Sequence, residues 1–153
     1  MRSTAVSGII IVQLYICRNT SMVIVVDTSV IIAVMLNEAS KPLLIRHTTN
    51  AELIAPGSLH WEIGNALSAM VKRKRLAAAE AQRALHEYQK IPLRFHDVDI
   101  DVTLDIVAQH AIYAYDAYFI TCARTQSAPL LTLDQKLQAK AQAAGVSIIE
   151  VAP

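Results

Sequence analysis

The fold of this chain is constrained most by a series of short apolar runs, each followed by a segment with helical periodicity. The first run, residues 23–26 (VIVV), is β-branched at every position and shows no alternation of apolar and polar residues. Such a run predicts a strand that is buried on both faces, as in parallel sheets covered by helices. Further strand candidates follow at residues 53–55, 93–96, 130–133 and 146–151.

The segments between these runs place apolar residues at helical spacing. The predicted helices cover residues 28–36, 37–50, 58–75, 77–90, 101–110, 116–125 and 134–144. Ser58 is a candidate N-cap of the long third helix, and Gly145 is a candidate C-terminal stop of the last one. Strands that alternate with helices predict one α/β domain, a three-layer α/β/α sandwich with a central parallel sheet.

Residues 1–21 precede the first predicted strand and form a separate N-terminal extension. Their apolar run, residues 8–17, is about half as long as the roughly 20 residues of a membrane-spanning helix. A signal peptide is the alternative, but the stretch has a single charge before this run, Arg2, and no small-residue cleavage site after Cys17. Met22 stands directly before the first strand, so we expect the native start at Met22 and the domain at residues 22–153.

The composition excludes several classes of protein. The chain has 153 residues, of which 54% are hydrophobic and 18% charged, so a packed globule is expected rather than disorder. A net charge of +1 provides no overall attraction to nucleic acid. Cys17 and Cys122 lie far apart, which argues against a disulfide scaffold and favours a reducing, cytoplasmic location without a membrane.

Three aspartates occur at the ends of strands or the beginnings of helices. Asp27 follows the first strand, Asp134 follows the run at residues 130–133, and Asp116 opens a predicted helix. The carboxyl ends of parallel strands form the ligand-binding edge of an open α/β sheet. An aspartate before a helix is also a common N-cap, so the sequence leaves both interpretations open for each residue.

Glu62 lies one turn inside the third predicted helix, beside its apolar stripe. The stripe recurs at intervals of three and four residues and is formed by Leu59, Ile63, Leu67, Met70 and Val71. The neighbours of Glu62 on its own face are small or polar, among them Asn65, and leave room for a ligand. The alternative is an ordinary glutamate on a helix surface.

Convergence of Asp27, Glu62, Asp116 and Asp134 would require a cation or protons. Two unit charges about 5 Å apart repel by about 3 kcal/mol at an effective dielectric constant of 20. An all-oxygen donor set without Cys or His favours Mg²⁺ or Mn²⁺ over zinc. A carboxylate-held Mg²⁺ with open water positions is suited to phosphodiester hydrolysis, and no P-loop, G-x-G-x-x-G or G-x-S-x-G motif offers another chemistry.

Positive charge for a nucleic-acid backbone is concentrated in one run, which consists of Lys72, Arg73, Lys74 and Arg75. This basic run is a candidate RNA-binding element. Basic residues are also favourable at the C-terminal end of a helix, so a purely structural role is an equal alternative.

Four segments together resemble the PIN-domain ribonucleases, specifically the VapC-type toxins of bacterial toxin–antitoxin pairs. The segments are residues 25–29 (VVDTS), 60–67 (HWEIGNAL), 115–123 (YDAYFITCA) and 131–137 (LTLDQKL). The resemblance covers residues 22–151. Each motif alone is weak, but the four in this order are specific.

The resemblance implies Mg²⁺- or Mn²⁺-dependent RNA cleavage, with Asp27, Glu62, Asp116 and Asp134 as the acidic metal-binding set. It also implies Thr28, Ser29 and Asn65 as supporting polar groups, a homodimer, and inhibition by a cognate antitoxin protein. Residues 1–21 have no counterpart in the family pattern. A non-catalytic module of the same fold, which binds a partner protein or RNA, is the alternative function.

Overall fold

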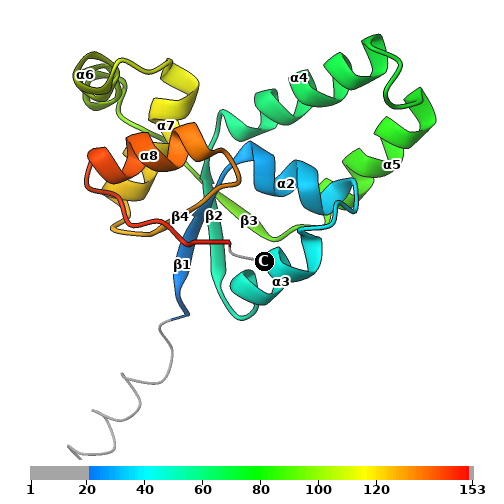
Figure 1. The fold of residues 1–153 in the computed structure, drawn as a ribbon, viewed down its shortest axis with the longest axis horizontal. Helices are drawn as coiled ribbons and strands as arrows, with labels where there is room; N and C mark the ends of the chain where they lie inside the picture. The colour runs from blue at the N-terminus through cyan, green and yellow to red at the C-terminus, as the bar shows by residue number, and fades with distance from the viewer. Residues whose placement is uncertain (1–20, 152–153) are drawn as a thin grey trace, which may run out of the picture.

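The computed structural model describes residues 21–151 and shows an α/β fold around a four-stranded parallel sheet (Figure 1). Its strands are β1 (Val23–Val26), β2 (Glu52–Pro56), β3 (Leu93–His96) and β4 (Leu130–Leu131). They are arranged in the order β3-β2-β1-β4, and every neighbouring pair is parallel. The predicted parallel sheet is therefore confirmed, and β1 lies inside it between β2 and β4.

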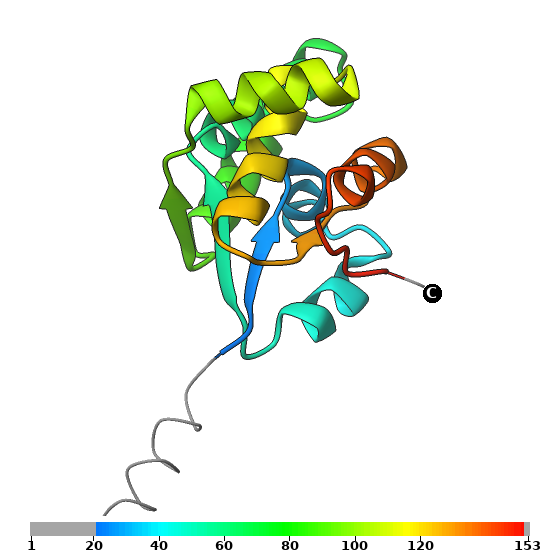
Figure 2. The same cartoon turned by 90° about the vertical axis from the view of Figure 1, so that its left-hand side faces the viewer.

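Helices flank this sheet on both sides. They are α2 (Thr28–Met35), α3 (Lys41–Thr48), α4 (Leu59–Lys72), α5 (Ala78–Gln89), α6 (Ile100–His110), α7 (Ala114–Thr125) and α8 (Gln135–Ala143). Figure 1 shows α6, α7 and α8 to the left of the sheet, and α2, α4 and α5 to its right. Figure 2 shows α7 in front of the strands, where it covers one face of the sheet. This arrangement confirms the predicted α/β/α layering.

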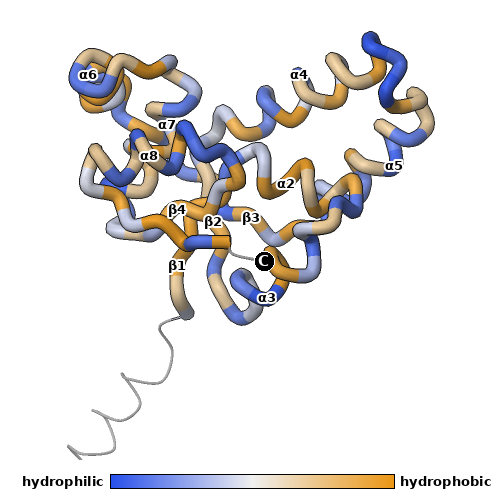
Figure 3. The backbone as a smooth tube through the Cα atoms, in the orientation of Figure 1, coloured by the Kyte–Doolittle hydropathy of each residue, from blue (hydrophilic) through white to orange (hydrophobic). Residues whose placement is uncertain are grey.

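The burial of β1 explains why its sequence lacks alternation. Ile24, Val25 and Val26 are all completely buried, because helices cover both faces of the strand. On α4, Leu59, Ile63 and Leu67 of the predicted stripe are buried. The stripe is only half-buried near the end of α4, where the helix extends beyond the sheet towards the hydrophilic tip between α4 and α5 (Figure 3).

Two predicted strands differ in the structure. β4 ends at Leu131, because its neighbour β1 ends at the paired residue Val26 and leaves no strand for residues 132–133 to pair with. The Thr132 hydroxyl donates a hydrogen bond to Asp27 just beyond this point. Residues 146–151 form no regular strand, only a single parallel bridge between Ile148 and Leu130. One predicted helix also begins earlier than expected. Asp116 was predicted to open it, but α7 begins at Ala114, with Tyr113 as the N-cap residue.

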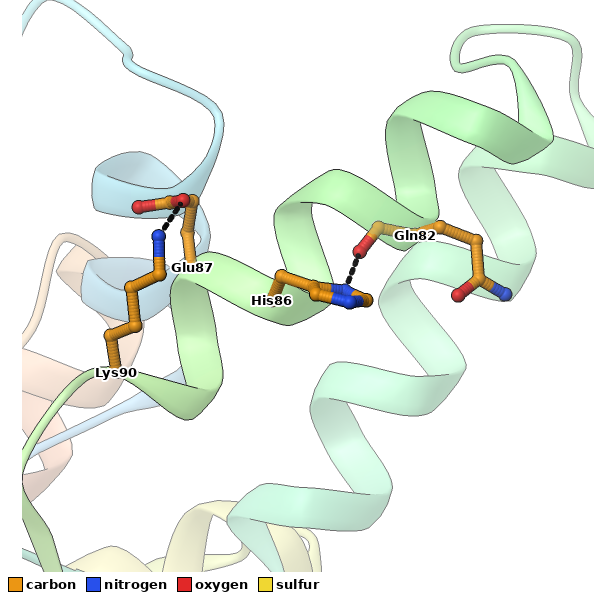
Figure 4. Close-up of polar contacts among 4 residues, drawn as sticks. All are labelled: Gln82, His86, Glu87 and Lys90. Carbon is orange, nitrogen blue, oxygen red and sulfur yellow. Dashed lines mark hydrogen bonds and ion pairs between the residues drawn. The ribbon is translucent and has the colours of Figure 1, made fainter.

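The outer face of α5 carries local polar contacts (Figure 4). Lys90 Nζ lies 2.6 Å from Glu87 Oε1, and His86 Nδ1 lies 2.8 Å from the carbonyl oxygen of Gln82. The ion pair is solvent-exposed, so it contributes little to stability. These groups serve the helix itself rather than a site.

The predicted N-terminal extension lies outside the described residues, apart from Ser21, and so does Cys17. The native start at Met22 therefore stays a prediction. Among residues 21–151, no helix is both long and apolar enough to cross a membrane.

Candidate active site

Polar and acidic residues gather where the parallel strands end. Asp27 directly follows β1, Glu62 lies in the first turn of α4 after β2, and Asp134 precedes α8 shortly after β4. Because all these strands run in the same direction, their carboxyl ends share one edge of the sheet. Asp116 comes from the first turn of α7, which packs against β1 and β2.

Asp27 is buried, with 5% of its surface exposed, and is held by three donors. Its Oδ1 accepts hydrogen bonds from Ser29 Oγ at 2.6 Å and from the backbone N–H of Val30 at 3.3 Å. Its Oδ2 accepts one from Thr132 Oγ1 at 2.8 Å. Asp27 is thus the N-cap of α2, and it also joins β1 to the end of β4. The N-cap interpretation is correct here, but it does not account for the bond to Thr132.

Glu62 is half-buried, and both of its carboxylate oxygens accept hydrogen bonds. Oε2 accepts from Thr28 Oγ1 at 2.8 Å, and Oε1 accepts from Ser58 Oγ at 3.0 Å. Thr28 is the residue after Asp27, so these bonds tie the first turn of α4 to the first turn of α2. The interpretation of Glu62 as an ordinary surface glutamate does not fit this arrangement.

Asp134 and Asp116 are held differently. Asp134 is exposed and caps α8, because its Oδ1 accepts hydrogen bonds from the backbone N–H groups of Lys136 at 2.7 Å and Leu137 at 3.2 Å. The backbone N–H of Asp134 in turn donates to Thr132 Oγ1 at 3.0 Å. Asp116 has a raised pKa for which burial is the main cause, and within residues 21–151 its carboxylate accepts no hydrogen bond.

Electrostatic coupling connects the four carboxylates. Burial raises the pKa of Asp27, and the charge of Asp134 raises it further. Burial also raises the pKa of Glu62, as do the charges of Asp27 and Asp116. The pKa of Asp116 is raised by burial and by the charge of Asp134. Asp27, Asp116 and Asp134 thus each raise the pKa of another carboxylate, and a bound cation would relieve this repulsion.

Burial of the carboxylates, together with this coupling, predicts that the metal-free protein loses stability as the pH rises. The folded protein holds protons on Asp27, Glu62 and Asp116 more tightly than the unfolded chain, whose ordinary pKa values are 3.8 for Asp and 4.5 for Glu. The free energy of unfolding therefore falls as the pH rises from about 4 through the raised native pKa values.

Urea unfolding in EDTA at pH 5 and pH 7 measures this difference in stability. The Asp116→Asn variant should show a smaller difference than the wild type, while Asp105→Asn, which changes an exposed acid of α6, should not. An equal difference in all three proteins would show that the carboxylates are not strained by their mutual charge.

The predicted supporting residues divide into two groups. Thr28 and Ser29 donate to Glu62 and Asp27, and Ser29 Oγ also accepts a hydrogen bond from the Leu133 N–H at 2.9 Å. Asn65 is exposed and forms no side-chain hydrogen bond within the described part of the chain.

The roles of two hydroxyl donors, Ser58 and Thr132, were not predicted from the sequence. Ser58 was expected only as an N-cap, but its side chain makes no capping hydrogen bond and donates to Glu62 instead. Ser58 stands four residues before Glu62, and side chains at this spacing face each other on a helix. Thr132 stands two residues before Asp134 at a strand end. Both spacings are visible in the sequence and could have pointed to these donors.

The oxygen atoms of these side chains are suitable ligands for a hard divalent cation. All four groups are carboxylates, and hydroxyl oxygens surround two of them. Among residues 21–151 no group of three or more Asp, Glu, His or Cys side chains is close enough to hold one ion. Mg²⁺ commonly keeps several waters and binds through only one or two carboxylates, so the arrangement still fits this ion.

Residues 21–151 contain no cysteine suited to act as a nucleophile. Cys122 is a buried free cysteine of α7, and burial raises its pKa to about 11. Its thiolate is therefore scarce at neutral pH, and the thiolate is the nucleophilic form.

The basic run lies away from these carboxylates. Lys72 ends α4, Arg73 is its C-cap, and Lys74 adopts a left-handed backbone with a φ of 55°. Lys72 is ten residues beyond Glu62, which corresponds to about 15 Å along the helix. All four basic side chains are exposed. The run therefore adds no group to the carboxylate site.

This fold is that of a PIN domain. The model of the PIN domain family matches residues 24–143, and the chain belongs to this family. It is 30% identical over 121 residues to Ribonuclease VapC9 of Mycobacterium tuberculosis, an alignment that covers 78% of this chain and 92% of that protein. The protein is thus a distant homologue of the VapC ribonucleases.

Solved structures support the same fold. The structure of PAE2754 from Pyrobaculum aerophilum matches with a TM-score of 0.67 and 22% identity, covering 86% of this chain and 92% of that one. VapBC2 from Rickettsia felis, bound to a DNA fragment from its promoter, matches with a TM-score of 0.60 and 14% identity. The match covers 84% of this chain and 98% of that one. The expected resemblance to PIN-domain and VapC proteins is confirmed.

Proposed function

We propose that this protein is a Mg²⁺- or Mn²⁺-dependent endoribonuclease that acts as the toxin of a toxin–antitoxin pair. The observation that carries the proposal is the pair of hydroxyl-held carboxylates, Asp27 and Glu62, at the strand edge. Two further acids, Asp116 and Asp134, act on them through their charge. Homology to Ribonuclease VapC9 supports the choice of RNA as the substrate.

In this proposal Asp27, Glu62, Asp116 and Asp134 would form the metal site, with one or two of them bound to the ion directly and the others contacting its waters. The metal would polarise a phosphoryl oxygen and lower the pKa of a bound water. The chain's own contribution is to fix the carboxylates in advance. Ser29 and Thr132 direct lone pairs of Asp27, and Thr28 and Ser58 orient Glu62. Because these hydrogen bonds already exist in the folded protein, little reorganisation is needed when the substrate arrives.

The partners proposed are a cognate antitoxin protein, an RNA substrate and a second copy of the chain in a homodimer. The likeness to VapBC2 supports an antitoxin partner. A non-catalytic PIN module that binds a protein or RNA is the alternative, but such a module gains nothing from carboxylates whose charges oppose each other.

Induced expression tests the function directly. Wild-type protein should arrest growth and produce new RNA 5′ ends, whereas Asp27→Asn should do neither at the same protein level. Growth arrest by both proteins without new RNA ends would favour the non-catalytic module. Co-expression of a small protein encoded beside this one should restore growth if that protein is the antitoxin.

The basic run is expected to contribute RNA affinity rather than chemistry. Replacement of Lys72, Arg73, Lys74 and Arg75 by Ala should flatten the salt dependence of RNA binding, by about 0.7 in log–log slope for each phosphate that these side chains neutralise. Cleavage at saturating RNA should change little, because the run lies far along α4 from Glu62. The measurement is binding to single-stranded RNA at several salt concentrations.

Arg46→Ala, which removes an exposed charge from α3, is the control for this measurement. An unchanged slope in the fourfold variant would mean that the basic run only completes the end of α4.

A further inference from the structure

An aromatic pocket lies beside the candidate carboxylates, at the same edge of the sheet. Its cavity measures about 440 Å³, and residues at the ends of β2 and β3 line it. In the sheet order β3-β2-β1-β4, the pocket therefore lies on the β3 side of the carboxylates, which follow β2, β1 and β4. We call it the aromatic pocket, and its principal residues are Ser58, Trp61, His96, Tyr115 and Tyr118.

Shared residues join the pocket to the candidate active site. Ser58 lines the pocket and also donates the hydrogen bond to Glu62 Oε1. Trp61 is the neighbour of Glu62 in α4, and Tyr115 is the neighbour of Asp116 in α7. A molecule in this pocket thus lies next to any group that the carboxylates act on.

The aromatic side chains of the pocket are available for stacking. Trp61 is 73% exposed and Tyr115 is 50% exposed, although large aromatic side chains are usually buried in protein cores. The Tyr118 ring stands edge-on to Tyr115, with centroids 5.9 Å apart and planes at 88°, which supports Tyr115 from the side. Exposed aromatic faces bind single-stranded nucleic acid because every base has a stacking face.

The pocket also offers an unpaired polar atom. His96 lines it, and the buried Nε2 of His96 has no hydrogen-bond partner among residues 21–151. Buried polar atoms normally have partners, so this nitrogen is suited to meet a polar group of a ligand. The cavity volume is within the range of about 300–1,000 Å³ that is typical of small-molecule sites.

We propose that the aromatic pocket binds one unpaired base of single-stranded RNA and thereby places the neighbouring phosphodiester at the carboxylates. The inference rests on the proposed ribonuclease function. It is consistent with chain chemistry, since each backbone phosphate lies between two nucleosides and a base is therefore within reach of a pocket beside the phosphate that is cleaved. Trp61 and Tyr115 are substrate-contacting residues in this proposal, and His96 reads the edge of the base.

Trp61 is the single tryptophan of the chain, so its fluorescence reports directly on the pocket. The first experiment titrates the full-length protein in EDTA with a short single-stranded oligoribonucleotide. A second titration uses the same oligoribonucleotide with abasic sites, which keeps the phosphates and removes bases. The intact RNA should quench Trp61 at saturation, and the abasic RNA should bind about 5- to 150-fold more weakly with little quenching.

Cleavage kinetics with Mg²⁺ form the second experiment. Trp61→Ala and Tyr115→Ala should raise KM by about 5- to 150-fold and leave kcat within a few-fold of wild type, while Trp61→Phe should recover most of the affinity. Tyr113→Ala is the matched control, because Tyr113 is 86% exposed, stands two residues before Tyr115 and does not line the pocket. It should behave as wild type.

Two results would overturn the inference. The first is saturable RNA binding without quenching of Trp61, together with wild-type kcat/KM in Trp61→Ala. The second is a change from dimer to monomer in Trp61→Ala and Tyr115→Ala by light scattering without quenching by RNA, which would assign the pocket to a contact between two copies. Quenching by RNA in a wild-type protein that cleaves nothing would instead refute the ribonuclease and leave the base pocket standing.

Discussion

The Asp116→Asn variant is expected to lose RNA cleavage by about 100-fold or more while folding at least as stably as the wild type. Removal of one preorganised charge at a reacting centre commonly costs about 10²- to 10³-fold in rate. Asn has nearly the same volume as Asp, so the packing of α7 against the sheet is preserved. Loss of activity in a folded protein would thus report on charge alone.

Stability should rise slightly in this variant because Asp116 has an unfavourable charge and accepts no hydrogen bond within residues 21–151. Burial and the charge of Asp134 raise its pKa, so the ionised form is disfavoured in the metal-free protein. The residue is partly exposed, which limits the expected gain to about 1 kcal/mol.

The measurements for Asp116→Asn are cleavage rates at saturating Mg²⁺ and urea unfolding in EDTA, with Asp105→Asn as the control in both. Asp105 is an exposed acid of α6, and its variant should match the wild type. Cleavage by Asp116→Asn within a few-fold of wild type would remove Asp116 from the proposed site.

Metal removal is the second change with a large expected effect. EDTA should abolish cleavage, Mg²⁺ or Mn²⁺ should restore it, and Zn²⁺ should not. The four candidate ligands supply only hard oxygen atoms, and within residues 21–151 no His or Cys joins them to form a site of the kind that zinc prefers.

Metal binding should also be visible without RNA. Because Mg²⁺ would bind the folded protein through carboxylates that repel each other in its absence, it should raise the melting temperature of the wild type. The increase should be smaller in Asp116→Asn, and the same concentration of Na⁺ should have little effect. Full cleavage in excess EDTA would exclude the metal-dependent mechanism.

Local patterns in the sequence were sufficient to predict most of the fold. The β-branched run of β1 predicted a strand buried on both faces, and Ile24, Val25 and Val26 are completely buried. The helical spacing of Leu59, Ile63 and Leu67 predicted the buried face of α4. These features follow from side-chain periodicity, which depends only on residues that are close together in the sequence.

The errors occurred where a long-range contact decided the local structure. Residues 132–133 have the composition of a strand, but Thr132 leaves the sheet and donates to Asp27, which is 105 residues away in the chain. Residues 146–151 also have a strand-like composition, yet only Ile148 pairs with Leu130. Periodicity contains no information about which strand or side chain from elsewhere in the chain lies beside the end of a strand.

The order of strands and helices, the family motifs and the acidic residues that follow the strands can all be read from the amino-acid sequence. The bonds that join Asp27 and Glu62 to other elements cannot be read from it, because these donors are distant in the chain: Thr28 lies 34 residues from Glu62, and Thr132 lies 105 residues from Asp27. The double role of Asp27, as an N-cap and as a partner of the chain after β4, likewise emerges only on folding. Hydrogen bonds and charge coupling depend on distance in space, and only the folded chain fixes that distance.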